Sequence, residues 1–411
     1  MTATPLSRRA LLGGVGAAGL TVGVAGGALG REALAADPTA DRAGADERAA
    51  GALGRAAVPF FGPRQAGITE AAQARVQWAA FDLAPGVGRD GLRQLLRQWS
   101  ATAARLARGE TAEAAENQIA LDAGPCGLTF TFGFGAAVFE KAGLTDRRPA
   151  ALAPLPAFPE DAIDPARSEG DLWVQIGADD ALVVFHAFRV LQRQAAGLAG
   201  LRWQMAGFSR TPGATERPMT PRNLMGQIDG TGNPKPADAG FEEKVFAGGS
   251  DWMRGGTYAV VRRIRMLLDN WEALPTDRQE RVIGRRKSDG GPLSGGSEHT
   301  PVDLTATGAD GGLLIPADAH VRVAAPAANG GATMLRRGFS YADGMAADGA
   351  PDAGLLFVAY QADPGKGFVP VQRKLARGDG LSRFLRHESS GLYAVPPGAP
   401  EGGYVGQQLL D

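Results

Sequence analysis

The order of strand and helix patterns limits the possible folds of this chain more than any other feature. In the first half, strand-like and helical stretches follow one another as strand 73–83, helix 89–108, strands 128–134 and 172–177, helix 179–198 and strand 201–208. The first helical stretch places its leucines and Trp99 on one face, and Asp179 or Asp180 can cap the second. Strand–helix–strand, twice over, is the order of a ferredoxin-like unit.

The second half repeats this order loosely. Strand patterns occur at 256–266, 334–341 and 355–361, and helical patterns at 268–274, 276–284 and 367–376, the last despite Pro370 near its start. The stretch 290–301 is a Gly/Ser-rich loop. The sequence therefore predicts an α+β fold of two ferredoxin-like halves, 57–215 and 216–411, with antiparallel sheets and helices packed outside.

The N-terminus has the features of an export signal. Ser7-Arg8-Arg9 precedes an apolar run, Ala10 to Gly30, and Ala33-Leu34-Ala35 supplies the small residues of a cleavage site. Residues 1–35 are predicted to be a twin-arginine signal peptide and residues 36–56 a flexible lead-in. An uncleaved anchor is the alternative, although the Gly and Ala content makes the run a poor membrane span. The mature protein is expected in the periplasm, the cell envelope or outside the cell, with no stable membrane span.

Charge and cysteine content exclude several classes of protein. The formal net charge of −1 makes nucleic acid an unlikely partner. The single cysteine, Cys126, excludes an intrachain disulfide and a multi-cysteine zinc or iron–sulfur site within one chain. A small buried side chain is the expected role of Cys126.

One glycine-rich loop carries a candidate acid or base. In the stretch 222–236, Asp229 is preceded by Gly226 and followed by Gly230, Thr231 and Gly232. Glycines let a backbone pass close to a flat ligand, so the carboxylate could reach over the face of that ligand. Taken alone, the same residues also suit a surface turn.

The histidines and arginines limit the metal chemistry. Three of the four histidines have simple structural interpretations: His186 lies on a packed helix, His299 in a solvated loop and His387 in a polar segment at the surface or behind a site. His320 is predicted at the mouth of a short strand within 316–326. Arg336 and Arg337 lie inside an apolar strand, where a buried arginine needs an anionic partner. No spacing suggests zinc or di-iron, whereas one His, one Asp and one Arg are what a haem peroxidase needs.

These motifs, in this order, resemble the dye-decolourising (DyP-type) haem peroxidases over essentially the whole mature chain. Within that family, the chain looks most like the twin-arginine-exported branch, which includes the periplasmic iron-transport-associated peroxidases. The matching segments are Phe60 to Ile68, Gly170 to Asp180, Arg202 to Phe208, Gly226-Gln-Ile-Asp-Gly230, Ile283 to Lys287 with Gly291-Pro-Leu293, Ala319-His-Val-Arg322, Met334 to Gly338 and Phe357 to Gly367.

The resemblance implies one haem b per chain, bound mainly by the C-terminal half. By this likeness His320 is the proximal ligand of the haem iron and Asp229 the distal acid/base. Arg336 is the distal arginine, with Arg337 as the second candidate, and Gly230, Thr231 and Gly232 line the haem. The implied partners are hydrogen peroxide and a reducing small molecule such as a dye or phenol. The alternatives are a deferrochelatase, which releases iron from haem together with iron-uptake partners, and a non-enzymatic haem-binding envelope protein.

The chain departs from the family pattern at three places. Position 64 is Arg where histidine is common, Gln227-Ile228 replaces Phe-Lys, and Ala325-Pro326-Ala327 stands where the branch often has Asn-Pro-Arg. The last change removes a possible propionate contact and bears on haem affinity.

An aspartate base with an unperturbed pKa of about 3.9 also predicts that dye oxidation is fastest at acidic pH.

Overall fold

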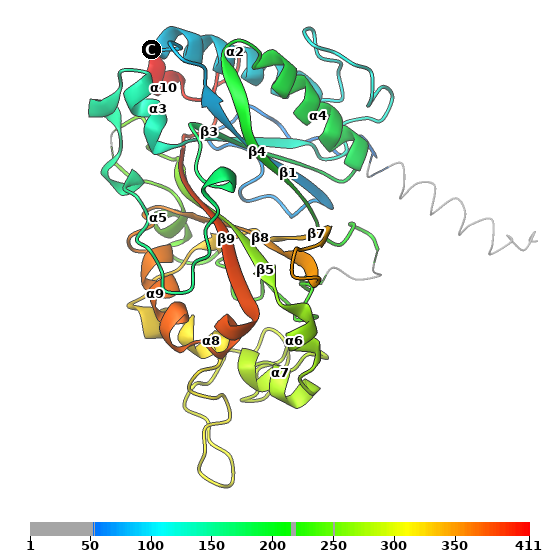
Figure 1. The fold of residues 1–411 in the computed structure, drawn as a ribbon, viewed down its shortest axis with the longest axis vertical. Coiled ribbons are helices and arrows are strands. Elements are labelled where there is room, and N and C mark those ends of the chain that lie inside the picture. The colour runs from blue at the N-terminus through cyan, green and yellow to red at the C-terminus, as the bar shows by residue number, and fades with distance from the viewer. Residues whose placement is uncertain (1–51, 53, 215–218, 250) are drawn as a thin grey trace, which may run out of the picture. The chain divides into compact units, whose positions relative to one another are not determined.

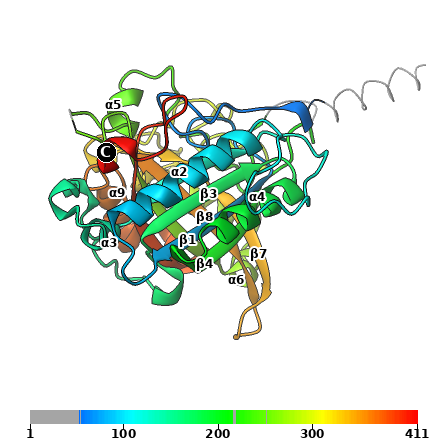
Figure 2. The same ribbon diagram turned by 90° about the horizontal axis from the view of Figure 1, so that it is seen from above.

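The four strands predicted in the N-terminal half form an antiparallel sheet. A computed structural model describes residues 52, 54–214, 219–249 and 251–411, so the predicted signal peptide and most of the lead-in lie outside the described residues. The strands are β1 (Arg75–Leu83), β2 (Thr129–Phe134), β3 (Leu172–Ala178) and β4 (Ala199–Phe208), arranged in the order β2-β3-β1-β4. Two long helices, α2 (Arg89–Leu106) and α4 (Ala181–Gln194), cover one face of this sheet (Figures 1 and 2).

The helices lie where the sequence predicts them, for the expected reasons. The apolar face of α2 is buried, and Trp99 at its centre is fully buried. Asp180 caps α4, because its Oδ1 accepts hydrogen bonds from the backbone N–H groups of Leu182 (2.8 Å) and Val183 (3.0 Å). Cys126 is buried, as predicted. A short helix, α3 (Ala136–Lys141), follows β2.

The C-terminal half supplies five further strands. They are β5 (Thr257–Met266), β6 (Leu335–Arg336), β7 (Phe339–Met345), β8 (Pro351–Gln361) and β9 (Leu385–Val395), and β5 lies between β8 and β9. The single strand predicted at 334–341 is interrupted after Arg336. The sequence pattern did not predict β9, because this strand begins with the polar run at His387.

The two halves are joined into one hydrogen-bonded sheet. Phe134 of β2 pairs with Ala394 of β9, and Phe208 of β4 pairs with Ser340 of β7. Because β5 also pairs with β8, the strands close into a ring. Large aromatic side chains from both halves fill the inside of this ring, among them Trp78, Trp173, Tyr341, Tyr360 and Tyr393. The mixed fold with antiparallel strands is confirmed, and the sheets of the two halves are continuous.

The helices of the C-terminal half pack outside the strands. They are α5 (Phe241–Val245), α6 (Leu268–Glu272), α7 (Thr276–Ile283), α8 (His320–Val323), α9 (Phe368–Gly378) and α10 (Gln407–Leu410). Pro370 lies in the first turn of α9, where a proline is tolerated. Among the described residues, no helix combines the length and the apolar character needed to cross a membrane.

The prediction that His320 lies at the mouth of a strand is wrong, because His320 is the first residue of α8. The side chain of Arg322 turns back and donates hydrogen bonds to the carbonyl oxygens of Ile315 (2.8 Å) and Pro316 (3.0 Å). These bonds fold the segment on itself. Val321 and Val323 belong instead to a single helical turn.

Candidate functional site

The loop that carries Asp229 is fixed by its own hydrogen bonds. The backbone N–H of Asp229 donates to the carbonyl of Pro221 (2.9 Å), and Arg222 pairs with Ile228 in an isolated bridge. Gly226 has φ 77° and Gly230 has φ 130°, conformations that favour glycine. A Cβ at Gly226 would lie 2.6 Å from Cε of Lys287. The glycines therefore serve the close packing of this loop.

Asp229 and Arg336 form an ion pair across 107 positions of sequence. Nη1 of Arg336 donates to Oδ1 of Asp229 (3.0 Å), and Nδ2 of Asn223 donates to its Oδ2 (3.3 Å). Desolvation by burial raises the pKa of Asp229, but the charge and hydrogen bond of Arg336 outweigh it and hold the pKa below its usual range. The side chains remain 30% and 33% exposed, so both still face open space.

The side chain of Asn233 clamps the backbone of Arg336. Its Nδ2 donates to the carbonyl of Arg336 (2.6 Å), and its Oδ1 accepts from the N–H of Arg336 (3.2 Å). On the other edge, β6 pairs with β8. Arg336 is thus held between a strand and a single amide, and Asn233 belongs to the same loop as Asp229.

Arg337 points the other way. Its guanidinium donates to the carbonyls of Glu70 and Ala71 (2.9 Å) and to Oε1 of Gln73 (2.5 Å), all in the N-terminal half. Successive side chains of an extended chain point to opposite faces. Of the two arginines, Arg336 is therefore the one beside Asp229.

His320 is oriented by a carboxylate that the sequence did not reveal. Oδ2 of Asp379, just after α9, lies 2.7 Å from Nδ1 of His320. Desolvation lowers the pKa of His320, but the charge and hydrogen bond of Asp379 outweigh it and raise the pKa. Among the residues that the structure describes, none forms a hydrogen bond with the other ring nitrogen, Nε2, so this nitrogen can bind a ligand. In the sequence, Asp379 is only an aspartate shortly after the predicted helix 367–376, a position where aspartates also serve as caps.

Asp229, Arg336 and His320 lie close enough for their charges to act on one another, and an aromatic side chain lies on the same face of the sheet as Arg336. The charge on His320 acts on the pKa of Asp229, and the charges on Arg336 and Asp229 act on the pKa of His320. By the register of β6 and β8, Phe357 lies on the same sheet face as Arg336. Helix α9 has Phe368 packed on Phe357 at one end (ring centroids 6.0 Å apart) and Asp379 next to the other.

The remaining predicted residues lie beside these groups or away from them. Thr231 donates to Oε1 of Glu298 (2.9 Å), which ties the Asp229 loop to the Gly/Ser-rich loop. His186 lies on the packed helix α4, as predicted, and its Nε2 is 2.9 Å from Oε1 of Glu116. His299 is exposed, as predicted. His387 lies on β9 near Gln372, and burial together with the charge of Arg262 lowers its pKa to about 3.

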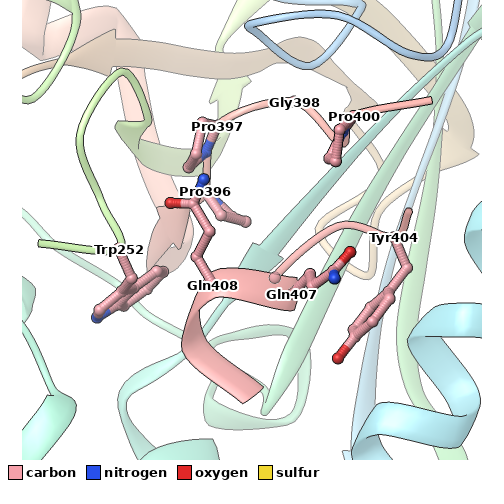
Figure 3. Close-up of a pocket in the computed structure, with 9 residues that line it drawn as sticks. Trp252, Pro396, Pro397, Gly398, Pro400, Tyr404, Gln407 and Gln408 are labelled. Atoms are coloured by element: carbon pink, nitrogen blue, oxygen red, sulfur yellow. The ribbon is translucent and has the colours of Figure 1, made fainter. Parts of the chain in front are cut away.

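A separate small cavity lies near the C-terminal end of the chain. Trp252, Tyr404, Gln407 and a proline-rich turn line it (Figure 3), and neither Asp229, Arg336 nor His320 belongs to its lining. Its volume of about 20 Å³ suffices for a water molecule and is far too small for a cofactor.

The fold and site match one family. The family model described as Dyp-type peroxidase, N-terminal, covers residues 65–209, and the C-terminal model covers residues 220–400. The chain therefore belongs to the DyP-type peroxidases. These are hydrogen-peroxide-dependent enzymes with a haem cofactor.

Several known proteins are similar to this chain along most of its length. A "Dye-decolorizing peroxidase" of Thermobifida fusca is 44% identical, over 98% of this chain and 97% of that protein. A crystal structure of the oxyferrous complex of DtpA from Streptomyces lividans is 60% identical, with a TM-score of 0.86 and coverage of 88% of this chain and 99% of that chain. A "Deferrochelatase" of Escherichia coli K12 is 34% identical, over 86% of this chain and 87% of that protein.

The residues of this chain fit a haem. The site offers one imidazole whose Nδ1 is held by Asp379, an acid paired with an arginine, and the aromatic pair of half-buried Phe357 and buried Phe368. These are the ligand and pocket types that haem peroxidases need.

Proposed function

We propose that Asp229, Arg336 and His320 carry the peroxidase reaction, with His320 as the protein ligand of haem b. The ion pair between Asp229 and Arg336, whose charges act on the pKa of His320, is the observation that carries this proposal. Gly230, Thr231 and Gly232 lie beside Asp229 and are proposed to line the haem. When bound, haem supplies an iron centre that accepts oxidising equivalents from hydrogen peroxide and passes them to a reducing substrate.

The side chains of the chain move protons and stabilise charge. Asp229, kept ionised by Arg336, takes a proton from one oxygen of hydrogen peroxide and returns it to the other oxygen, which leaves as water. Arg336 stabilises the negative charge that develops as the O–O bond breaks. Asp379 holds the Nδ1 proton of His320, which fixes the imidazole orientation and makes Nε2 a stronger donor to a metal.

The test is stopped-flow absorbance after mixing the holoenzyme with stoichiometric peroxide. In the wild type the Soret band should shift rapidly. Asp229→Asn should slow this shift by about 10²–10⁴-fold, the usual contribution of general acid–base catalysis. Asp310→Asn, in an exposed loop, is the matched control and should react like the wild type. An Asp229→Asn variant that reacts as fast as this control would refute the assignment.

Release of iron from haem is a second candidate function. Its support is the set of relatives named "Deferrochelatase", such as the Escherichia coli protein. To test it, the haem-loaded chain is incubated without peroxide, while free iron is followed with a chelator and metal-free porphyrin by fluorescence. Porphyrin formation would support this candidate and would also predict iron-uptake partners. Haem that stays intact without any dye turnover would favour a non-enzymatic haem-binding envelope protein.

Export by the twin-arginine route is proposed from the sequence. Arg8 and Arg9 precede the apolar run Ala10 to Gly30, and this route carries folded proteins, so haem could be loaded before export. Replacing both arginines by lysine should leave full-length protein in the cytoplasm. Unchanged appearance of the shortened protein in the periplasm or medium would exclude the route.

A further inference from the structure

Exposed apolar side chains gather on one surface of the N-terminal half. Seven large apolar residues are exposed in the part of the chain that the structure describes, and four of them lie on two neighbouring segments. These four are named the α4 patch: Ile119 (40% exposed), Leu121 (53%), Leu182 (58%) and Phe185 (50%). The other three, Met219, Leu313 and Met345, lie apart in sequence. Concentration of exposed apolar surface in one place is typical of an interaction site.

Three contacts place the two segments side by side. At the last turn of α4, Arg193 donates to the carbonyl of Ala115 (3.2 Å), and in the middle of the helix Nε2 of His186 lies 2.9 Å from Oε1 of Glu116. Just before the first turn, the backbone N–H of Asp179 donates to the carbonyl of Cys126 (2.8 Å). The segment 115–126, which includes Ile119 and Leu121, therefore runs along α4 from its last turn back to its first turn. Figure 2 shows this segment next to α4 on the outer side of the sheet.

Buried residues lie beneath the part of the α4 patch that α4 contributes. Beneath it, His186, Val183 and Val184 are buried, and the Glu116–His186 contact anchors the neighbouring segment. Since these elements are already ordered by the core, little conformational entropy is lost when a partner covers the patch.

Charges of opposite sign flank the α4 patch. Asp122, which is exposed, follows Leu121 toward the first turn of α4, and half-buried Arg189 lies one turn beyond Phe185. Within the described residues neither side chain takes part in an ion pair, although Arg189 donates to Gln192. From Leu182 to Arg189 the helix rises about 10 Å. A two-fold axis through the patch would therefore bring the acidic end of one copy to the basic end of the other.

We propose that the α4 patch is the interface of a homodimer, in which two copies pack α4 against α4 in antiparallel fashion. Leu182 and Phe185 of the two copies bury each other, and Asp122 of each copy faces Arg189 of the other. This is a self-complementary contact of the two-fold kind that most soluble homo-oligomers use. A lipid surface would instead favour a rim of basic residues around the apolar centre. The haem site, at α8 and α9, is left open (Figure 1).

The first test is sedimentation equilibrium of the mature holoenzyme over a range of micromolar concentrations. The wild type is expected to be dimeric, and Leu182→Ser/Phe185→Ser monomeric with an unchanged Soret spectrum and dye turnover. Leu313→Ser, which removes an exposed leucine elsewhere, is the control and should remain dimeric. A monomeric wild type, or a dimer that survives the double substitution, would overturn the proposal.

A charge exchange tests the two-fold arrangement itself. Asp122→Lys and Arg189→Glu should each weaken the dimer at least tenfold in Kd, and the combined variant should recover most of this loss, because the exchanged charges still face each other. Melting temperatures of all variants show whether each monomer is folded. Failure of the combined variant to recover would overturn the antiparallel pairing, as would single variants that dimerise like the wild type.

Discussion

Replacing Arg336 by Gln should shift the acid limit of peroxide reactivity to higher pH. In the structure Arg336 opposes the desolvation of Asp229 and holds the pKa of this carboxyl below its usual range. Without the positive charge, only the hydrogen bond of Asn223 and the charge of His320 still oppose desolvation, and the pKa of Asp229 rises. Asp229 then becomes protonated, and inactive as a base, at a pH where the wild type still reacts. The low pKa in the wild type keeps Asp229 ionised at acidic pH, where an aspartate base predicts that dye oxidation is fastest.

The geometry of the pair sets the size of this shift. Charges about 4 Å apart interact by about 1 kcal/mol in bulk water and about 4 kcal/mol at an effective dielectric constant of about 20. Asp229 is 30% exposed and Arg336 is 33% exposed, so the lower part of this range applies. An interaction of about 1–2 kcal/mol corresponds to a shift of about 1 pH unit. For the same reason, the pair stabilises the fold at neutral pH, and this contribution is lost as pH falls through the lowered pKa of Asp229.

The assay is the rate of the peroxide-induced Soret change from pH 3 to 8, with haem occupancy measured at each pH. Arg336→Gln should move the acid limb upward by about 1 pH unit and also lower the plateau rate by about 10²–10³-fold, as expected when an oxyanion-stabilising donor is lost. Arg373→Gln, on the exposed face of α9, is the matched control. An acid limb that stays in place while the plateau rate falls would refute the electrostatic coupling of Asp229 to Arg336.

Four further predictions follow from the site. His320→Ala should lose the wild-type Soret spectrum and bind haem more weakly in a titration, and a variant with unchanged spectrum and affinity would exclude His320 as the ligand. Asp379→Asn should keep His320 in place but lower haem affinity by about 10–100-fold and raise the reduction potential, which a redox titration measures; an unchanged potential would contradict an electronic role. Asn233→Ala should lower the free energy of unfolding by about 1–3 kcal/mol, because the backbone N–H and C=O of Arg336 lose their partner, and should slow the reaction with peroxide. By contrast, Arg337→Ala should lower the midpoint of urea unfolding but leave the rate of the holoenzyme with peroxide near that of the wild type. Equal losses of this rate at Arg336 and Arg337 would contradict the opposite orientation of the two side chains.

The sequence by itself was sufficient for the local elements and the candidate residues. Helices α2 and α4 follow from the spacing of their apolar residues, and strands β1 to β5 follow from their short runs of apolar, aromatic and β-branched residues. Asp229 was marked by its glycines, which act within a few residues of it. Signals of this kind are local, so they are visible without knowing which parts of the chain meet.

The tertiary structure decided what depends on contacts between distant segments. Ring closure through the single pairs Phe134 with Ala394 and Phe208 with Ser340 has no local signature, nor has strand β9, whose polar start resembles a loop. The helical position of His320 depends on a side chain that binds carbonyls of the preceding turn. Asp379 lies 59 positions from His320, and Asn233 lies 103 positions from Arg336. A hydrogen bond over such a separation is set by how the chain folds back, because a single aspartate or asparagine looks the same in sequence whether it caps a helix or orients a catalytic group.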